Sequence, residues 1–280
     1  MTLRSAGRLG AWVAALCAAT AAPAAAQLRP LDPIPWDAVG VDGAAARIGV
    51  GAHGDARATL AGTRGRLLEL GTILGTWSSG RVTLEVGGTA LRVFTDDSVY
   101  AVPVEGARSS TGERRIDTGE HRLGTIVRLT PPGGSADAVL RFGTILPTTQ
   151  NEAGLGRDQT DFFGTVGGRL RRGPYEITGE AGVGILGTRR SRPEQVDALL
   201  YAGAVGWSGT RSAARLEVMG QHDTRRAAEL RGLEDLSELR LSAQAGRARW
   251  VRTTLVRGLT FASPALGMSV EVGLSRRRRP

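Results

Sequence analysis

The chain has 280 residues, of which 41% are hydrophobic and only 5% aromatic, and 36 Lys+Arg against 27 Asp+Glu give it a net charge of +9. After the first 26 residues no stretch approaches the ~18 uninterrupted apolar residues of a membrane-spanning helix, which excludes that class of membrane protein. The only cysteine, Cys17, lies in those first residues, so the rest of the chain has no disulfide, thiolate metal site or Cys nucleophile.

Residues 1–26 have the pattern of a secretion signal peptide. Arg4 and Arg8 form a basic start, and an apolar, Ala-rich run follows that is too short to cross a bilayer. Ala24 and Ala26 supply the small residues that signal peptidase requires. We therefore expect the mature protein to begin at Gln27.

Residues 27–40 are rich in proline, with Pro30, Pro33 and Pro35, and show no periodicity. Because proline disfavours both helix and sheet interiors, this stretch predicts an extended periplasmic arm.

Residues 41–275 alternate apolar and polar side chains in segments of about 10 residues separated by turn residues, which is typical of a transmembrane β-barrel. The pattern predicts an all-β fold, a single antiparallel barrel of about 12 strands, followed by a basic tail at residues 276–280. The expected strands are Arg47–Gly51, Arg66–Trp77, Val82–Phe94, His121–Thr130, Ala138–Leu146, Asp161–Leu170, Tyr175–Gly187, Val196–Trp207, Ala214–Gln221, Glu238–Ala245, Trp250–Phe261 and Leu266–Leu274.

The connections between these strands alternate between short turns and longer polar loops, including a long one expected after Gly51. Outer-membrane barrels have short periplasmic turns and longer outer loops, so both termini should be periplasmic. Trp77, Tyr175, Trp207 and Trp250 each fall at a strand end beside a short turn. Trp and Tyr favour the membrane–water boundary, and the four are expected to form an aromatic ring there.

The alternation also places charges at every second position of several strands. A lipid-facing Arg in mid-membrane costs about 2–4 kcal/mol, so these charges should point into the lumen. The expected lumen-lining residues are Arg122, Arg128, Arg141, Glu176, Glu180, Arg215, Glu217, Glu238 and Arg240. With both signs interleaved, the lumen could conduct or could be plugged by its own ion pairs.

The basic charge does not indicate nucleic-acid binding, because the arginines alternate along strands and a secreted chain meets little nucleic acid. The expected partners are outer-membrane lipid, the barrel insertion machinery and a small-molecule solute.

No motif predicts catalysis, a cofactor or a metal. The glycines at 182, 184 and 187 match a dinucleotide fingerprint only in letters, because an Arg-rich loop, not a helix, follows them. His53, His121 and His222 are far apart and lack metal-ligand spacing. A lipid-acting hydrolase would need His121 or His222 beside a serine, and no Gly-x-Ser-x-Gly motif supports one.

One stretch resembles a known family. The segment from Leu140 to Phe163, with its strand, Pro147, Gly154-Leu155-Gly156 and a following Asp, resembles outer-membrane barrels of the meta-pathway of phenol degradation, also described as transporters. The similarity covers about 50 residues, from Asp117 to Thr165. It implies an outer-membrane barrel of the solute-uptake type, with no catalytic residues to transfer. The chain departs from such barrels in lacking a terminal aromatic residue after its last strand.

Together these observations predict a non-enzymatic outer-membrane barrel for passive uptake or binding of a small polar or aromatic solute. The alternatives are a lipid-acting outer-membrane hydrolase and a non-conducting structural barrel.

Overall fold

The computed structural model describes residues 29–39, 44–60, 63–99, 112–131, 133–149, 155–156, 159–187, 195–223 and 235–278. The predicted signal peptide lies outside these residues. Every regular element in the described ranges is a strand, and no helix there is long and apolar enough to cross a membrane. The strands are β1 (Ala44–Leu60), β2 (Thr63–Ser79), β3 (Val82–Val99), β4 (Arg114–Asp117), β5 (His121–Arg128), β6 (Ala136–Leu146), β7 (Asp161–Arg172), β8 (Tyr175–Gly187), β9 (Gln195–Ser208), β10 (Ser212–Asp223), β11 (Leu236–Gly246), β12 (Arg249–Gly258) and β13 (Leu266–Arg278).

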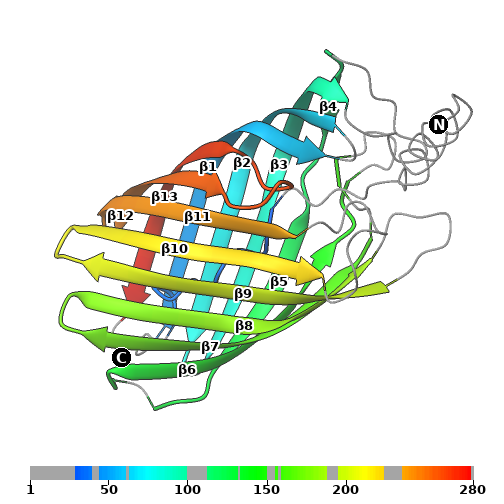
Figure 1. Ribbon diagram of the computed structural model, residues 1–280. Coiled ribbons are helices and arrows are strands. Elements are labelled where there is room, and N and C mark those ends of the chain that lie inside the picture. Colours follow the sequence, from blue (N-terminus) through cyan, green and yellow to red (C-terminus); the bar gives the residue numbers. More distant parts are fainter. Residues whose placement is uncertain are drawn as a thin grey trace, which may run out of the picture.

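The strands form one closed antiparallel barrel (Figure 1), which confirms the predicted fold class. Neighbours in sequence pair along the wall, and β1 pairs with β13 to close it. The strands β4 and β5 pair with successive parts of β3 and behave as one interrupted strand, so the wall has twelve positions. The interruption is at residues 118–120, where Gly119 N donates to Thr89 O at 3.0 Å.

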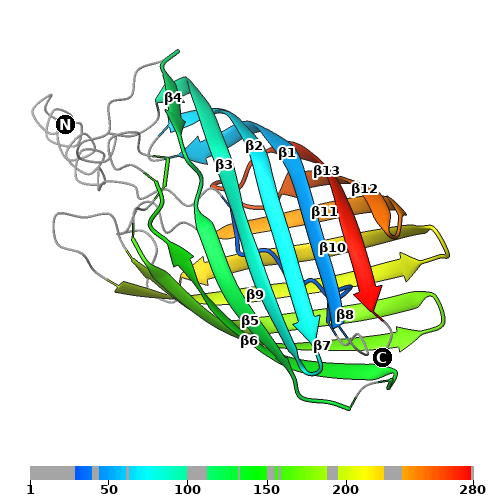
Figure 2. The same ribbon diagram turned by 180° about the vertical axis from the view of Figure 1, so that it is seen from behind.

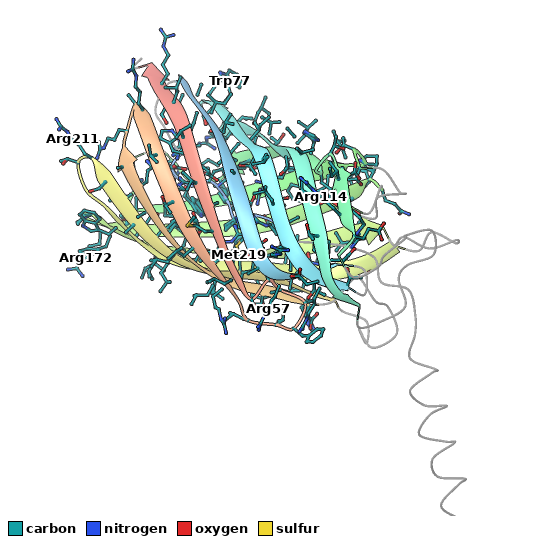
Figure 3. All side chains as sticks on the ribbon, turned by 90° about the horizontal axis from the view of Figure 1, so that it is seen from above. Arg57, Trp77, Arg114, Arg172, Arg211 and Met219 are labelled. Atoms are coloured by element: carbon teal, nitrogen blue, oxygen red, sulfur yellow. The ribbon has the colours of Figure 1, made fainter. Side chains whose placement is uncertain are left out.

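Side chains on the wall alternate between an apolar outer face and a polar inner face, as lipid outside and water inside require. On β8, for example, Ile177 and Val183 are exposed on the outside while Thr178 is buried. A wall this apolar would be costly in water, so the outer face fits a lipid environment. Figure 3 shows Trp77 on this outer face.

Short turns gather at one end of the barrel, where β1 begins and β13 ends. Gly80 in the β2–β3 turn, Gly173 in the β7–β8 turn and Gly246 in the β11–β12 turn all have positive φ, between 58° and 86°. Only glycine adopts this conformation without strain, which explains why these tight turns form. Figure 3 places Arg172 and Arg211 at this same end.

The first three strands are the longest, with 17, 17 and 18 residues, and they extend beyond the rest of the wall at the opposite end (Figure 2). The sequence predicted only Arg47–Gly51 for the first of them, followed by a long loop. The structure continues β1 to Leu60, which pairs with Thr63, the first residue of β2. The outward positions of this extension carry only the small residues Ala52, Gly54 and Ala56, so the apolar half of the alternation that marks the other strands is weak here.

The last strand was also predicted too short. Residues 276–278 belong to β13, and Arg278 pairs with Ala44 at the barrel seam. The prediction of a basic tail is therefore wrong for these residues, because backbone pairing with β1 extends the strand beyond its apolar part. For β8 the predicted bounds, Tyr175–Gly187, agree with the structure.

Candidate functional site

The barrel lumen is occupied by part of the chain itself. Residues 29–39, here called the lumen segment, run inside the barrel (Figure 1, dark blue) and line a cavity of about 1200 Å³ together with the inner wall. The sequence predicted a periplasmic arm for this stretch, and that prediction is wrong for residues 29–39. The reason is chemical complementarity, because the apolar and acidic side chains of the segment contact matching side chains of the inner wall.

Asp32 links opposite sides of the wall. Its Oδ2 accepts from Arg122 Nη1 of β5 at 2.8 Å, and its Oδ1 accepts from Arg240 Nη1 of β11 at 2.7 Å. Around the barrel β5 and β11 are separated by five strands in either direction. One carboxylate therefore bridges the full width of the lumen.

Asp32 is held in its charged form. Burial alone would raise its pKa, but the guanidinium charges of Arg122 and Arg240 outweigh that effect and hold the pKa well below its usual range. The carboxylate is consequently ionised at neutral pH, which is the form that accepts from both arginines.

Arg141 binds the lumen segment to the wall. This fully buried side chain donates through Nε and Nη2 to both oxygens of Glu85, at 2.7 and 3.1 Å. Its Nη1 donates to the backbone oxygen of Asp32 at 2.8 Å and to Glu180 Oε1 at 3.2 Å. Glu180 in turn accepts from the backbone N of Ile34 at 2.8 Å. The backbone of the lumen segment is thus bound by side chains that are themselves paired.

A small apolar core holds the middle of the lumen segment. Ile34, Trp36 and Val39 pack with Ile126 of β5 and Val139 of β6, and all five are at most 3% exposed. The neighbouring wall position on β7 is Gly167. A Cβ there would clash with Ile34 Cδ1 and lie 3.1 Å from Trp36 Cζ2, so the absent side chain makes room for the segment.

Arg169 closes this core at the end with the short turns. It donates from Nη1 to Trp36 O at 2.5 Å and from Nη2 to Val39 O at 3.3 Å, and its guanidinium lies 5.1 Å from the Trp36 ring centroid. Asp137 accepts from its Nε at 3.0 Å and fixes the guanidinium. Ser78 Oγ donates to Ala38 O at 2.7 Å, anchoring the segment to β2 as well.

Asp37 occupies a second arginine pair. It contacts Arg47 of β1 and also Arg252 Nη2 of β12, the latter at 3.3 Å. Both arginines donate to Gln244 Oε1, at 2.8 and 3.1 Å. Between them lies Trp250, with the Arg47 Cζ 4.1 Å and the Arg252 Cζ 5.5 Å from a ring centroid.

Trp250 corrects one of the sequence predictions. It is 2% exposed and faces the lumen, so it is not part of the membrane-boundary ring. Strand parity explains this, because its neighbour Val251 is exposed on the outer face. The other three predicted ring members are exposed near the short turns: Trp77 by 50%, Tyr175 by 64% and Trp207 by 40%. Their role as membrane anchors stays a prediction.

The far end of the lumen segment is held by Arg29. Its Nη2 lies 3.2 Å from Asp55 Oδ2 and its Nε 3.6 Å from Glu69 Oε2, both on the long first strands. Asp55 also contacts His53 Nε2 at 2.5 Å, in a pair that is buried on both sides. The segment is therefore fixed at both ends as well as in its middle.

The other residues predicted to line the lumen fall into three groups. Arg215 pairs with Glu176 at 3.1 Å and with Glu217 at 2.7 Å, beside the cavity. Glu238 accepts from Arg240 Nε at 2.9 Å and supports the Asp32 bridge. Arg128 is buried at the end of β5, and its Nε and Nη1 have no hydrogen-bond partner among the residues that the structure describes.

Cationic side chains predominate around the cavity. Among the described residues, eleven arginines and seven acidic side chains line it, and two of the acids, Asp32 and Asp37, belong to the lumen segment. Arg29 also belongs to the segment, so the wall contributes ten of these arginines and five of the acids, and positive charge is in excess at the cavity surface.

The histidines considered for a hydrolase have other partners. His121 Nδ1 lies 3.0 Å from Thr148 Oγ1, and His222 Nδ1 lies 2.7 Å from Asp235 Oδ2 on an exposed part of the chain. Neither contact is to a serine hydroxyl.

These features define a closed β-barrel with an apolar outer wall and a charged lumen occupied by the N-terminal segment. No family model matches the chain, and no curated protein matches its sequence. The fold is similar to the COG4313 outer membrane channel from Pseudomonas putida F1, with a TM-score of 0.59 and 12% identity, covering 88% of this chain and 100% of that one.

Weaker similarities include a loop-deletion mutant of OmpT, an outer membrane protein of Vibrio cholerae, with a TM-score of 0.40 and 9% identity over 83% of this chain and 98% of that one. A porin has a TM-score of 0.39 and 8% identity over 83% and 99% of the two chains. At this identity the similarity to the channel shows the fold, that of an outer-membrane β-barrel.

Proposed function

We propose that this protein is an outer-membrane channel for passive uptake or binding of a small polar or aromatic solute. The observation that supports it is the cavity of about 1200 Å³, lined by charged side chains, inside a barrel whose outer wall is apolar. Such a cavity is a passage for solutes that the lipid bilayer excludes. The lumen segment narrows this passage, so its displacement from the wall would control flow.

The proposal also covers the family to which the protein belongs and its location in the cell. The similarity in fold to the COG4313 channel supports membership of the family that the stretch between Asp117 and Thr165 resembles. The apolar wall supports a location in the outer membrane, and the proposal includes cleavage of the signal peptide before Gln27 and a periplasmic position for the short turns and the end of β13. The sequence also predicted a periplasmic N-terminus, but Arg29 lies in the lumen against Asp55 and Glu69, away from the short turns. The barrel insertion machinery and outer-membrane lipid are the partners that this location requires.

A reversible lock on the lumen segment tests the proposal. Ala38 and Ser78 are already joined by a hydrogen bond of 2.7 Å, and the chain after residue 26 contains no cysteine. The double variant Ala38→Cys/Ser78→Cys should form a disulfide on oxidation that fixes the segment to β2. We expect single-channel current in planar bilayers to fall on oxidation and to recover with dithiothreitol, and each single variant to be insensitive to both treatments.

A non-conducting structural barrel is the second candidate, and the carboxylate of Asp32 that bridges β5 and β11 favours it. It predicts no current from the wild type or from the reduced double variant, although both migrate as folded, heat-modifiable barrels on gels. Current that passes equally in the locked and unlocked states would instead place the route beside the lumen segment and leave the channel proposal standing.

A further inference from the structure

The outer face of the barrel carries two arginines at the seam, next to the short turns. On β13 the outward residues Val272 and Leu274 are exposed, and Arg276 continues the same parity and is exposed too. On β12 Arg249 precedes the outward-facing Val251 by two residues and is also exposed. Both arginine side chains therefore lie on the lipid side of the wall and not in the lumen.

The two arginines border a shallow groove of about 300 Å³ between β1, β12 and β13. Its apolar lining consists of Ala46, Ile48, Ala248 and Leu274. The register of the sheet places Arg276 opposite Ala46 and Arg249 opposite Leu274. Cations thus lie beside an apolar surface, and this combination is complementary to a phospholipid with an anionic headgroup and apolar chains.

The protein does not neutralise either arginine. Within the part of the chain that the structure describes, no carboxylate forms an ion pair with Arg249 or Arg276. The short turns have exposed arginines in or beside four of them, at Arg81, Arg172, Arg211 and Arg247. No described residue in the short turns is acidic. A phosphate group binds a guanidinium through charge-assisted hydrogen bonds, and the phosphates within reach of an outward-facing arginine in a bilayer are those of lipid headgroups.

Trp77 indicates the depth of the groove in a bilayer. It pairs with Ala46 across β1 and β2, and it is 50% exposed on the outer face (Figure 3). An indole favours the boundary between acyl chains and headgroups, so Ala46 and the neighbouring Arg276 lie at headgroup depth. Ile48 and Leu274 lie two residues further along their strands, toward the acyl chains. An outward arginine is tolerated at headgroup depth, whereas it is costly at the centre of the bilayer.

We propose that this groove binds an anionic phospholipid, whose phosphate lies between Arg249 and Arg276 and whose acyl chains lie along Ile48 and Leu274. With the short turns in the periplasm, the lipid belongs to the inner leaflet of the outer membrane. The site is separate from the lumen and goes beyond the proposed channel, because it requires only that the wall lies in a bilayer. The bound lipid contacts both β1 and β13, the two strands that close the barrel.

Fluorescence quenching by lipids with brominated acyl chains tests the site, with Trp77 as the reporter. Trp36 and Trp250 are buried inside the barrel, so Trp207→Phe leaves Trp77 as the only outward-facing tryptophan among the described residues. The full-length protein in this background is reconstituted in phosphatidylcholine vesicles that contain brominated phosphatidylglycerol or brominated phosphatidylcholine. Brominated phosphatidylglycerol should quench Trp77 at a lower mole fraction than brominated phosphatidylcholine does.

Substitution of the two arginines should remove this preference in steps. An arginine near the membrane surface contributes about a fivefold gain in affinity for an anionic lipid. The preference for phosphatidylglycerol should therefore fall about fivefold in Arg249→Gln and in Arg276→Gln, and should be absent in the double variant. Heat-modifiable migration verifies that every variant is folded.

Arg172→Gln is the matched control, because Arg172 is exposed at the same end of the barrel (Figure 3). Three strands lie between β8, which follows Arg172, and β12, so the charge is about 19 Å from the groove along the wall and is screened by salt. The preference at Trp77 should be unchanged in this variant. In the converse background, Trp77→Phe with Trp207 kept, substitution of Arg249 and Arg276 should leave the quenching of Trp207 unchanged.

Equal quenching of Trp77 by the two brominated lipids overturns the inference. An unchanged preference in the folded double variant also overturns it, as does a loss in Arg172→Gln as large as that in Arg249→Gln, since the effect would then belong to the basic end of the barrel as a whole. Current is not part of this test. A barrel that conducts nothing can confirm the lipid site, and a failure of the lipid site leaves the channel proposal intact.

Discussion

Replacing Gly167 with leucine should displace the lumen segment without changing a single charge. The position faces the apolar core of the segment, and even a Cβ there would clash with Ile34 and press on Trp36. Ile34 is 2% exposed, and a buried side chain of its type contributes about 1.5–3 kcal/mol. Loss of that burial alone lowers the ratio of docked to undocked segment by about 10- to 150-fold. We therefore expect more frequent or longer openings in single-channel recordings of Gly167→Leu.

The adjacent glycine supplies a matched control. Gly168 faces outward on the same strand, and the nearest atom to a Cβ there is Asp137 O at 3.9 Å. Gly168→Leu adds the same side chain on the lipid side and should leave the recordings like those of the wild type. If Gly167→Leu is folded by heat-modifiable migration but its currents match those of Gly168→Leu, packing against β7 does not hold the segment, and this reasoning is refuted.

Three other measurements test the remaining contacts. The pKa of Asp32 lies well below its usual range, so the contribution of Asp32 to docking of the lumen segment is complete above about pH 4 and is lost only as pH falls through the lowered pKa. The open probability of the channel, as far as Asp32 sets it, should therefore be constant between about pH 5 and 8. A midpoint in that range would contradict the assignment. Arg141→Met leaves Glu85 with an uncompensated buried charge, so we expect the free energy of unfolding to fall by about 3–5 kcal/mol. The barrel should then change to its heat-modified migration at a lower temperature. An unchanged temperature would show that Arg141 is not essential to the wall. Trp77→Ala should weaken membrane anchoring by about 1 kcal/mol or more without altering the channel current, because Trp77 lies on the outer face. An altered current with unchanged stability would place the effect of Trp77 in the lumen.

The wall of this barrel could be predicted from the sequence because lipid and water impose a strict period of two on its strands. On β8 the alternation of apolar and polar side chains from Tyr175 to Gly187 gave the correct bounds and the correct face for Ile177. Where the outer side chains are small, as at Ala52, Gly54 and Ala56 on β1, the apolar signal was too weak to show the strand's full length.

The lumen segment could not be predicted by the same means, since it has no period and its partners are distant in sequence. One signal was present: Ile34 and Trp36 are large apolar residues in a stretch that an exposed periplasmic arm would leave in water. For Trp250 the sequence contained the answer in its parity with Val251, which the position at a strand end obscured. The pairing of Asp32 with Arg122 depends on which strands face each other across the lumen, and alternation along one strand does not contain that information.

The seam between β1 and β13 has a consequence for how the protein is made. The first strand synthesised is also the strand that completes the ring, and its pairing with the last one must await the whole chain. Only residues 40–43 separate β1 from the stretch that ends up enclosed, so that stretch must enter as the ring is completed or thread in from an open mouth afterwards. A fluorescent protein fused ahead of residue 29 should therefore impair biogenesis, whereas the same fusion in the β9–β10 turn should be tolerated.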